Sequence, residues 1–135
     1  MPATPSAAGL LGAARALLPR AMAPYSGYRV GAVLEDAAGE IHPGVNIESV
    51  SYGLTLCAER NALFGALARG AREFRRIAVV SGSEHPVRMC GACRQVLLEY
   101  APDLLVILER PGGAPEEVPI RDLLPLPFTR FEPAP

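Results

Sequence analysis

The chain has 135 residues, half of them hydrophobic, a length that fits one domain with its own apolar core. Its 13 basic residues, all arginines, are balanced by 14 acidic ones, so the net charge is −1 and no basic stripe indicates nucleic-acid binding. The apolar runs are too short to span a bilayer, and no basic segment followed by an apolar run marks a signal peptide, so we expect a cytoplasmic protein.

The first half of the chain predicts one helix and one hairpin. Leucines and alanines recur at helical spacing over residues 7–22, and Pro19 and Pro24 mark the end of this predicted helix. Residues 28–34 and 41–47 read as strands on either side of a turn at 36–39, which predicts a β-hairpin.

The second half alternates helices with strands. Residues 57–68 and 93–100 are predicted helices, ended by a glycine and a proline respectively. Residues 77–80 and 104–108 are short apolar runs typical of buried strands. Residues 118–120 are a candidate edge strand, where a proline is tolerated.

This order of elements predicts a three-layer α/β/α sandwich with a mixed five-stranded sheet. No linker, internal repeat or second hydrophobic pattern divides the sequence. We therefore expect a single domain over residues 1–135, with loose tails at 1–6 and 129–135.

All three cysteines lie in two short segments, Cys57 alone and Cys90 with Cys93 in a Cys-x-x-Cys pair. Both segments open predicted helices, where free backbone N–H groups and a partial positive charge favour the thiolate that binds metal. Three protein ligands around zinc leave the fourth position open for water, as in catalytic zinc sites. The pattern predicts a single Zn²⁺ per chain.

Other interpretations of the cysteines remain open. They could be buried small hydrophobic residues, or a redox pair that leaves Cys57 without a role. A closed, structural zinc site would need a fourth protein ligand, and the histidines available are His42 and His85. His85 lies five residues before Cys90 and is the better placed, although a histidine on a surface loop is the commoner reading for both.

Two charged residues follow Cys57 closely. Glu59 lies in the first turn of the predicted helix, where a carboxylate near an open zinc position can take a proton from water and pass it on. Its ordinary alternative role is to stabilise the helix dipole. Three thiolates on Zn²⁺ leave a net charge of about −1, which Arg60 could reduce by donating hydrogen bonds to sulfur. Arg94, next to Cys93, could do the same.

Four motifs occur in order at residues 25–32, 44–48, 57–60 and 90–97. Together they resemble the small homotetrameric cytidine deaminases of the three-cysteine type, and the resemblance runs from about 11 to 128. It implies zinc held by Cys57, Cys90 and Cys93, and hydrolytic deamination of cytidine and 2′-deoxycytidine with release of ammonia, as in pyrimidine salvage. In this family the matching Glu59 moves protons to ring N3 and then to the departing amine.

The resemblance also implies substrate contacts. Asn46 and Glu48 match the ribose-binding pair, and Tyr28 stands where the family has a phenylalanine that packs on the base. The backbone of Ala58 would hold the pyrimidine edge. Phe128 resembles a C-terminal phenylalanine that closes the pocket of a neighbouring subunit, which implies a homotetramer with shared active sites.

A few positions leave room for other functions. Tyr52 is a second candidate for reaching a neighbouring subunit. Met89, preceded by Arg88, replaces the family's proline before Cys-x-x-Cys, and Ser49 replaces its second asparagine. Proline would fix φ and remove an N–H, so methionine can alter the pocket. Deamination of another aminopyrimidine nucleoside, such as a nucleoside antibiotic, and a non-catalytic structural zinc module therefore remain alternatives.

Overall fold

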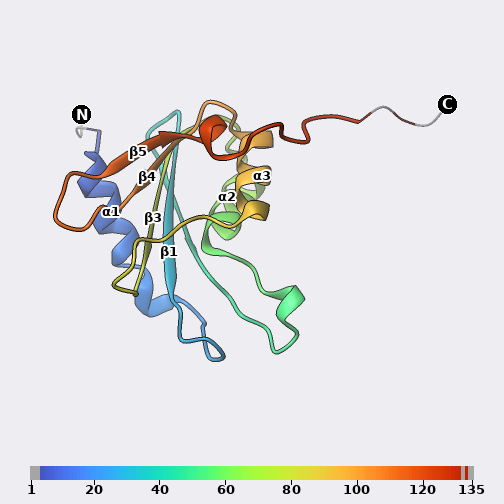
Figure 1. Ribbon diagram of the computed structural model, residues 1–135. Coiled ribbons are helices and arrows are strands. Elements are labelled where there is room, and N and C mark those ends of the chain that lie inside the picture. Colours follow the sequence, from blue (N-terminus) through green and yellow to red (C-terminus); the bar gives the residue numbers. More distant parts are fainter. Residues whose placement is uncertain (1–3, 132, 134–135) are drawn as a thin grey trace.

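A five-stranded mixed sheet forms the centre of the computed structural model, which describes residues 4–131 and 133 (Figure 1). In the order β2-β1-β3-β4-β5, its strands are β1 (Val30–Asp36), β2 (Ile41–Val45), β3 (Phe74–Ser81), β4 (Leu105–Leu108) and β5 (Glu116–Pro119). β3 and β4 run parallel, whereas each other neighbouring pair is antiparallel. The predicted mixed sheet is therefore confirmed.

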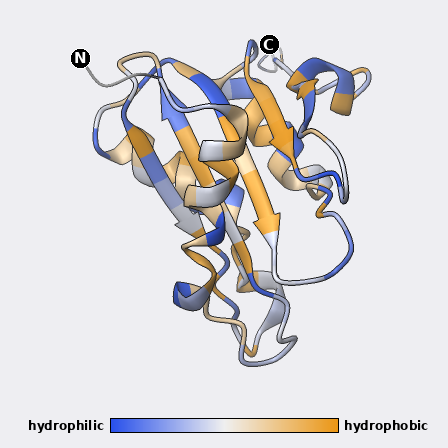
Figure 2. Ribbon diagram, turned by 90° about the vertical axis from the view of Figure 1, so that its left-hand side faces the viewer, coloured by the Kyte–Doolittle hydropathy of each residue, from blue (hydrophilic) through white to orange (hydrophobic). Residues whose placement is uncertain are grey.

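Helices cover both faces of this sheet. α1 (Ala7–Arg15) lies on one face, and α2 (Ala58–Ala68) and α3 (Gly91–Tyr100) lie on the other (Figure 1). Side chains alternate along β1, so that Ala32 and Leu34 pack towards α2 and α3 while Val33 packs towards α1. Figure 2 shows the hydrophobic strands enclosed between these layers. The three-layer sandwich explains why the middle strands are apolar on both faces.

The first helix ends earlier than the sequence pattern predicts. α1 stops at Arg15, and Leu18–Arg20 forms a separate 3₁₀ turn with Pro19 at its start. Proline has no N–H to donate to the preceding turn, so an α-helix cannot run through this position unbroken. None of the helices in the described ranges is long and apolar enough to cross a membrane.

A buried ion pair accounts for a strand that begins earlier than predicted. Arg76 lies within β3 and donates to the fully buried Glu35 of β1, with Nε–Oε1 and Nη2–Oε2 distances of 2.7 and 2.6 Å. The same guanidinium donates to the carbonyl of Pro5, and Ser6 caps α1. Of the segment 1–6 that we expected to be loose, these two described residues are therefore held by hydrogen bonds.

A close approach between backbones sets the position of α2. Gly44 of β2 lies so near this helix that a Cβ atom would stand 2.5 Å from the nitrogen of Ala62 and closer still to the carbonyl oxygen of Ala58. The helix turns Ala62, Leu63 and Ala66 inward, whereas Phe64 is exposed. Gly44 thus lets the first turn of α2 lie directly on the sheet.

Prolines stand at both outer strands of the sheet. Pro43 lies in the middle of β2, and Pro119 ends β5. Both positions agree with the rule that proline, which lacks an N–H, occurs in edge strands rather than central ones.

Candidate functional site

The three cysteines converge where α2 and α3 begin. Cys57 is the N-cap of α2, Cys90 is the N-cap of α3, and Cys93 lies in the first turn of α3. The sulfur of Cys90 lies 3.7 Å from that of Cys57 and 3.4 Å from that of Cys93, and all three sulfurs lie within 4.8 Å of one another. Tetrahedral zinc with Zn–S bonds of about 2.3 Å separates its sulfurs by about 3.8 Å, so the cluster fits this ion.

Hydrogen bonds prepare one of these sulfurs to carry negative charge. The pKa of Cys57 is lowered to about 5, chiefly by a hydrogen bond with Cys93 and then by Arg60, against the effect of burial. The same hydrogen bond, together with burial, raises the pKa of Cys93. Repulsion between negative charges opposes the formation of a second and a third thiolate. A bound divalent cation would offset this repulsion, so the three sulfurs suit a metal ion.

Glu59 is a buried carboxyl group beside the sulfurs. Only 4% of its surface is exposed, and this burial raises its pKa to about 7. Its own backbone N–H and a hydrogen bond with Cys93 act in the opposite direction, while charge on Cys57 adds to the rise. A carboxyl group that changes its protonation near neutral pH can both accept and return a proton.

The two arginines that follow cysteines have different contacts. Nη2 of Arg60 donates to the sulfur of Cys57 over 3.4 Å, and its buried Nε has no partner among the described residues. Arg94 donates instead to the carbonyl oxygens of Met89 and Leu123, each over 2.9 Å. Arg60 is thus the guanidinium that can reduce charge on sulfur, whereas Arg94 holds the loop that precedes Cys90.

Neither histidine joins the cysteines. In the described part of the chain, the possible metal ligands at the sulfurs are the three cysteines alone, and His85 is exposed outside this group. His42 is buried between Asp36 and Arg69, with Nε2–Oδ2 and Nδ1–Nη2 distances of 2.9 and 3.0 Å. Because arginine only donates, Nδ1 of His42 must accept and Nε2 must donate to Asp36.

The segment that carries Asn46 runs beside the start of α2. Ile47 and Leu56 exchange two backbone hydrogen bonds of 3.0 Å, which places Asn46 close to the chain entering Cys57. The side chain of Asn46 is buried; it accepts from the N–H of Val30 over 2.9 Å and donates to the carbonyl of Tyr28 over 2.7 Å. Asn46 therefore fixes the backbone from Tyr28 to Val30, the residue at which β1 begins, two residues later than predicted from the sequence.

Glu48 faces the loop that precedes β1. Its Oε1 accepts the backbone N–H groups of Tyr25 and Ser26 over 3.0 and 3.1 Å, and its Oε2 accepts the Ser26 hydroxyl. These bonds, the hydroxyl first, lower the pKa of Glu48. The carboxylate lines an open hollow of about 320 Å³ together with Tyr25, Ser26, Tyr52 and Thr55.

The aromatic residues assigned from sequence to a neighbouring subunit are both exposed. Tyr52 is 74% exposed and Phe128 is 64% exposed, although the carbonyl oxygen of Phe128 accepts a hydrogen bond from Gln95 of α3. Phe128 therefore does not cap the hydrophobic core of its own chain. Its backbone is nevertheless tied to the helix that carries Cys93.

Three further positions named in the sequence analysis are Ala58, Met89 and Arg88, and each is either buried or paired. Ala58, the first residue of α2, is fully buried. Met89 is also buried and packs in the core on the α2 and α3 side. Arg88 is exposed, and its guanidinium lies 3.5 Å from a carboxylate oxygen of Glu116. Met89 can therefore influence a pocket mainly through packing.

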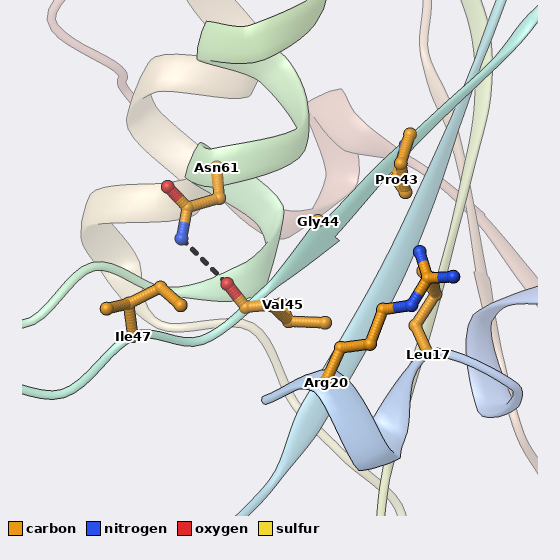
Figure 3. A pocket seen from close by; sticks show the side chains of 7 residues that line it. All are labelled: Leu17, Arg20, Pro43, Gly44, Val45, Ile47 and Asn61. Carbon is orange, nitrogen blue, oxygen red and sulfur yellow. Dashed lines mark hydrogen bonds between the residues drawn. The ribbon is translucent and has the colours of Figure 1, made fainter. Parts of the chain in front are cut away.

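A second hollow has none of the cysteines in its lining and lacks their chemistry. It has a volume of about 260 Å³ between α2, the edge strand and the turn after α1 (Figure 3). Its lining consists of Leu17, Arg20, Pro43, Gly44, Val45, Ile47 and Asn61. The amide of Asn61 donates to the Val45 carbonyl over 2.7 Å, which fastens α2 to β2. No local sequence pattern predicts this contact, because it joins a helix and a strand through one amide.

Comparisons with known proteins agree with this arrangement. Residues 7–109 match the family described as the cytidine and deoxycytidylate deaminase zinc-binding region. A cytidine deaminase of Halalkalibacterium halodurans is 48% identical over 110 residues, which is 81% of this chain and 83% of that protein. The crystal structure of cytidine deaminase from Burkholderia pseudomallei has a TM-score of 0.85 and 45% identity, covering 91% of this chain and 99% of that one. Blasticidin-S deaminase of Bacillus cereus is 34% identical over 114 residues, 76% of this chain and 79% of that protein.

Proposed function

The chain belongs to the cytidine and deoxycytidylate deaminase zinc-binding family, and we propose that it deaminates cytidine and 2′-deoxycytidine hydrolytically to uridine and 2′-deoxyuridine, with release of ammonia. This reaction belongs to pyrimidine salvage. The observation that carries the proposal is a cluster of three sulfurs with the spacing of zinc ligands beside a buried glutamate.

Each residue of the cluster has a proposed role. Cys57, Cys90 and Cys93 would hold zinc, which when bound supplies Lewis-acid activation of a water molecule. Glu59 takes a proton from the attacking water and gives it to ring N3 of the cytosine. Once the water oxygen is bonded to C4, Glu59 takes the remaining proton from that oxygen and delivers it to the C4 amino group, which leaves as ammonia when the C4–N bond breaks. The pKa of about 7 that burial gives Glu59 suits a group that must gain and lose protons in turn.

The substrate is proposed to lie between the sulfurs and the loop before β1. The amide of Asn46 has a second N–H, beyond the one donated to Tyr28, which can reach a sugar hydroxyl. Glu48 can accept from another hydroxyl, and its negative charge would repel a 5′-phosphate, which favours nucleosides over nucleotides. Tyr28 packs on the base, and the backbone of Ala58 holds the pyrimidine edge.

One of the relatives is a blasticidin-S deaminase, which favours a second candidate function. In this candidate, the same site deaminates another aminopyrimidine nucleoside, such as blasticidin S. The packing of Met89 in the core speaks against a large change of the pocket at that position. A closed structural zinc module finds less support, because no histidine lies with the three cysteines in the described ranges.

Ammonia release from cytidine, 2′-deoxycytidine and blasticidin S tests the proposal directly. We expect turnover of both nucleosides by protein with about one zinc per chain, loss of activity when a chelator removes the metal, and recovery when zinc is added back. Turnover of blasticidin S alone would select the second candidate. Retained zinc without turnover of any of the three compounds would contradict the deaminase proposal.

We further propose a homotetramer in which subunits share active sites. Support comes from the exposure of Tyr52 and Phe128, two large aromatic side chains that their own subunit leaves uncovered. The three free cysteines suit the reducing cytoplasm, where we propose that this single domain acts without a nucleic-acid or membrane partner.

Truncation of Phe128 tests the shared site. Phe128→Ala should raise the Michaelis constant for cytidine about tenfold, since an aromatic contact contributes about 0.5–1.5 kcal/mol beyond its buried area. Steady-state kinetics with sedimentation analysis would measure this effect. Phe131→Ala is the matched control, because Phe131 is similarly exposed at 73%. An unchanged Michaelis constant in an intact oligomer would count against a role for Phe128.

A further inference from the structure

Ser26 lies at the centre of a hydrogen-bonded network in the loop before β1. Its hydroxyl donates to Oε2 of Glu48 and accepts from the backbone N–H of Tyr28 over 2.9 Å. Its own backbone N–H donates to Oε1 of Glu48 over 3.1 Å. One small side chain therefore joins the carboxylate proposed to bind the sugar to the backbone of the residue proposed to pack on the base.

The backbone of Tyr28 is held on both sides. Its N–H donates to the hydroxyl of Ser26, and its carbonyl accepts from the amide of Asn46 over 2.7 Å. The Tyr28 ring is itself exposed, so its placement depends on these backbone anchors. Without the hydroxyl, the N–H anchor is lost, but the Asn46 anchor still holds the Tyr28 backbone, so we expect packing on the base to be kept.

The two oxygens of Glu48 are held differently. Oε1 accepts two backbone N–H groups, from Tyr25 and Ser26, whereas Oε2 accepts the Ser26 hydroxyl. The hydroxyl is also the largest cause that lowers the pKa of Glu48. Removing it frees Oε2 to rotate away from the hollow that Glu48 lines.

The turn itself does not depend on the hydroxyl. Gly27 adopts a φ of 72°, which favours glycine, and its N–H donates to the carbonyl of Ala23 over 2.9 Å. The backbone N–H bonds to Glu48 also persist when Ser26 becomes alanine. The fold of the loop and the orientation of Glu48 can therefore be tested separately.

We propose that Ser26 is a positioning residue that aligns the Glu48 carboxylate with Tyr28 and so sets recognition of the sugar hydroxyls. This inference rests on the proposed deaminase function. It predicts that the loss in Ser26→Ala appears in binding of the sugar rather than in the chemical step, because the hydroxyl touches neither the sulfurs nor Glu59.

The test compares cytidine with 2′,3′-dideoxycytidine, which lacks the sugar hydroxyls at issue. For Ser26→Ala we expect the Michaelis constant for cytidine to rise about tenfold, as expected when a hydrogen bond to a charged group is lost, with kcat within about twofold. The constant for 2′,3′-dideoxycytidine should stay near its wild-type value. Ser26→Thr, which keeps a hydroxyl, should restore most of the preference for cytidine.

Ser6→Ala is the matched control, because Ser6 also accepts a backbone N–H through its hydroxyl but lies at the start of α1. An unchanged cytidine constant in Ser26→Ala, or equal losses for both compounds, would overturn the inference. Equilibrium binding of the two compounds to the same zinc-loaded proteins gives the same comparison without catalysis. If the wild type binds cytidine but releases no ammonia, the proposed function is contradicted. The binding comparison would still show whether Ser26 sets recognition of the sugar.

Discussion

Glu59→Gln is expected to keep about one zinc per chain and to lower kcat for cytidine by about two to four orders of magnitude. Glutamine has nearly the shape of glutamic acid, so the start of α2 and the three cysteines should keep their positions. It cannot take up and release a proton, which is the step assigned to the buried Glu59 carboxyl group. Metal analysis and single-turnover kinetics on one preparation would measure both quantities.

Glu73→Gln provides the control for this change. Glu73 is exposed at the residue before β3, the opposite end of this strand from the loop that leads to Cys90, so its replacement should leave kcat and zinc content unchanged. A Glu59→Gln protein with wild-type kcat would rule out Glu59 as the proton carrier. Loss of zinc in this variant would instead show that Glu59 helps to hold the metal.

Gly44→Ala should destabilise the protein by at least about 4 kcal/mol, near the upper end of single-substitution effects. The added Cβ would meet backbone atoms of Ala58 and Ala62, which cannot rotate away as a side chain can. The first turn of α2 must then move, and because Cys57 is the N-cap of this helix, Cys57 moves away from Cys90. We therefore expect weaker zinc binding together with a lower denaturation midpoint, measured by chelator competition and by denaturant titration.

The same chemical change at another glycine separates this clash from a general effect of alanine. Gly12 lies in α1, and a Cβ there would meet nothing within 4 Å. Gly12→Ala should stabilise the protein by about 0.5–1 kcal/mol, because alanine restricts the unfolded chain more than glycine does. A Gly44→Ala protein with the wild-type midpoint and full zinc content would show that α2 does not need this close approach.

Sequence reasoning reached the overall arrangement because its signals are local. Apolar runs that are buried on both faces, together with a hairpin and alternating helices, were enough to predict a three-layer sandwich with a mixed sheet. The convergence of Cys57 with Cys90 and Cys93 followed from the placement of cysteines at two helix starts. Local patterns do not show which charged residues are buried. Arg76 has the sequence pattern of a surface residue, and its ion pair becomes evident only because Glu35 lies opposite it in β1.

Contacts among the proposed substrate-binding residues could not be predicted from local sequence patterns either. Tyr28, Asn46 and Glu48 are predicted to bind substrate through the family resemblance, and no local pattern in the sequence predicts how Tyr28 is joined to Asn46 and Glu48. Their connection through Ser26 depends on a loop that folds back onto a segment about twenty residues later, as the contact between Ser26 and Glu48 shows. Such a contact is a property of tertiary structure. The end of α1, by contrast, has a local signal in Pro19, although this proline does not by itself place the last helical residue at Arg15.

The prolines of the outer strands also restrict how copies of this protein can associate. A β-strand from another molecule would need an unbroken row of donors and acceptors along β2 or β5, and Pro43 and Pro119 interrupt these rows. The proposed homotetramer must then be built from helices and loops rather than from a sheet that continues across subunits. The same prolines should hinder templated fibril growth when concentrated protein is refolded or stored without metal.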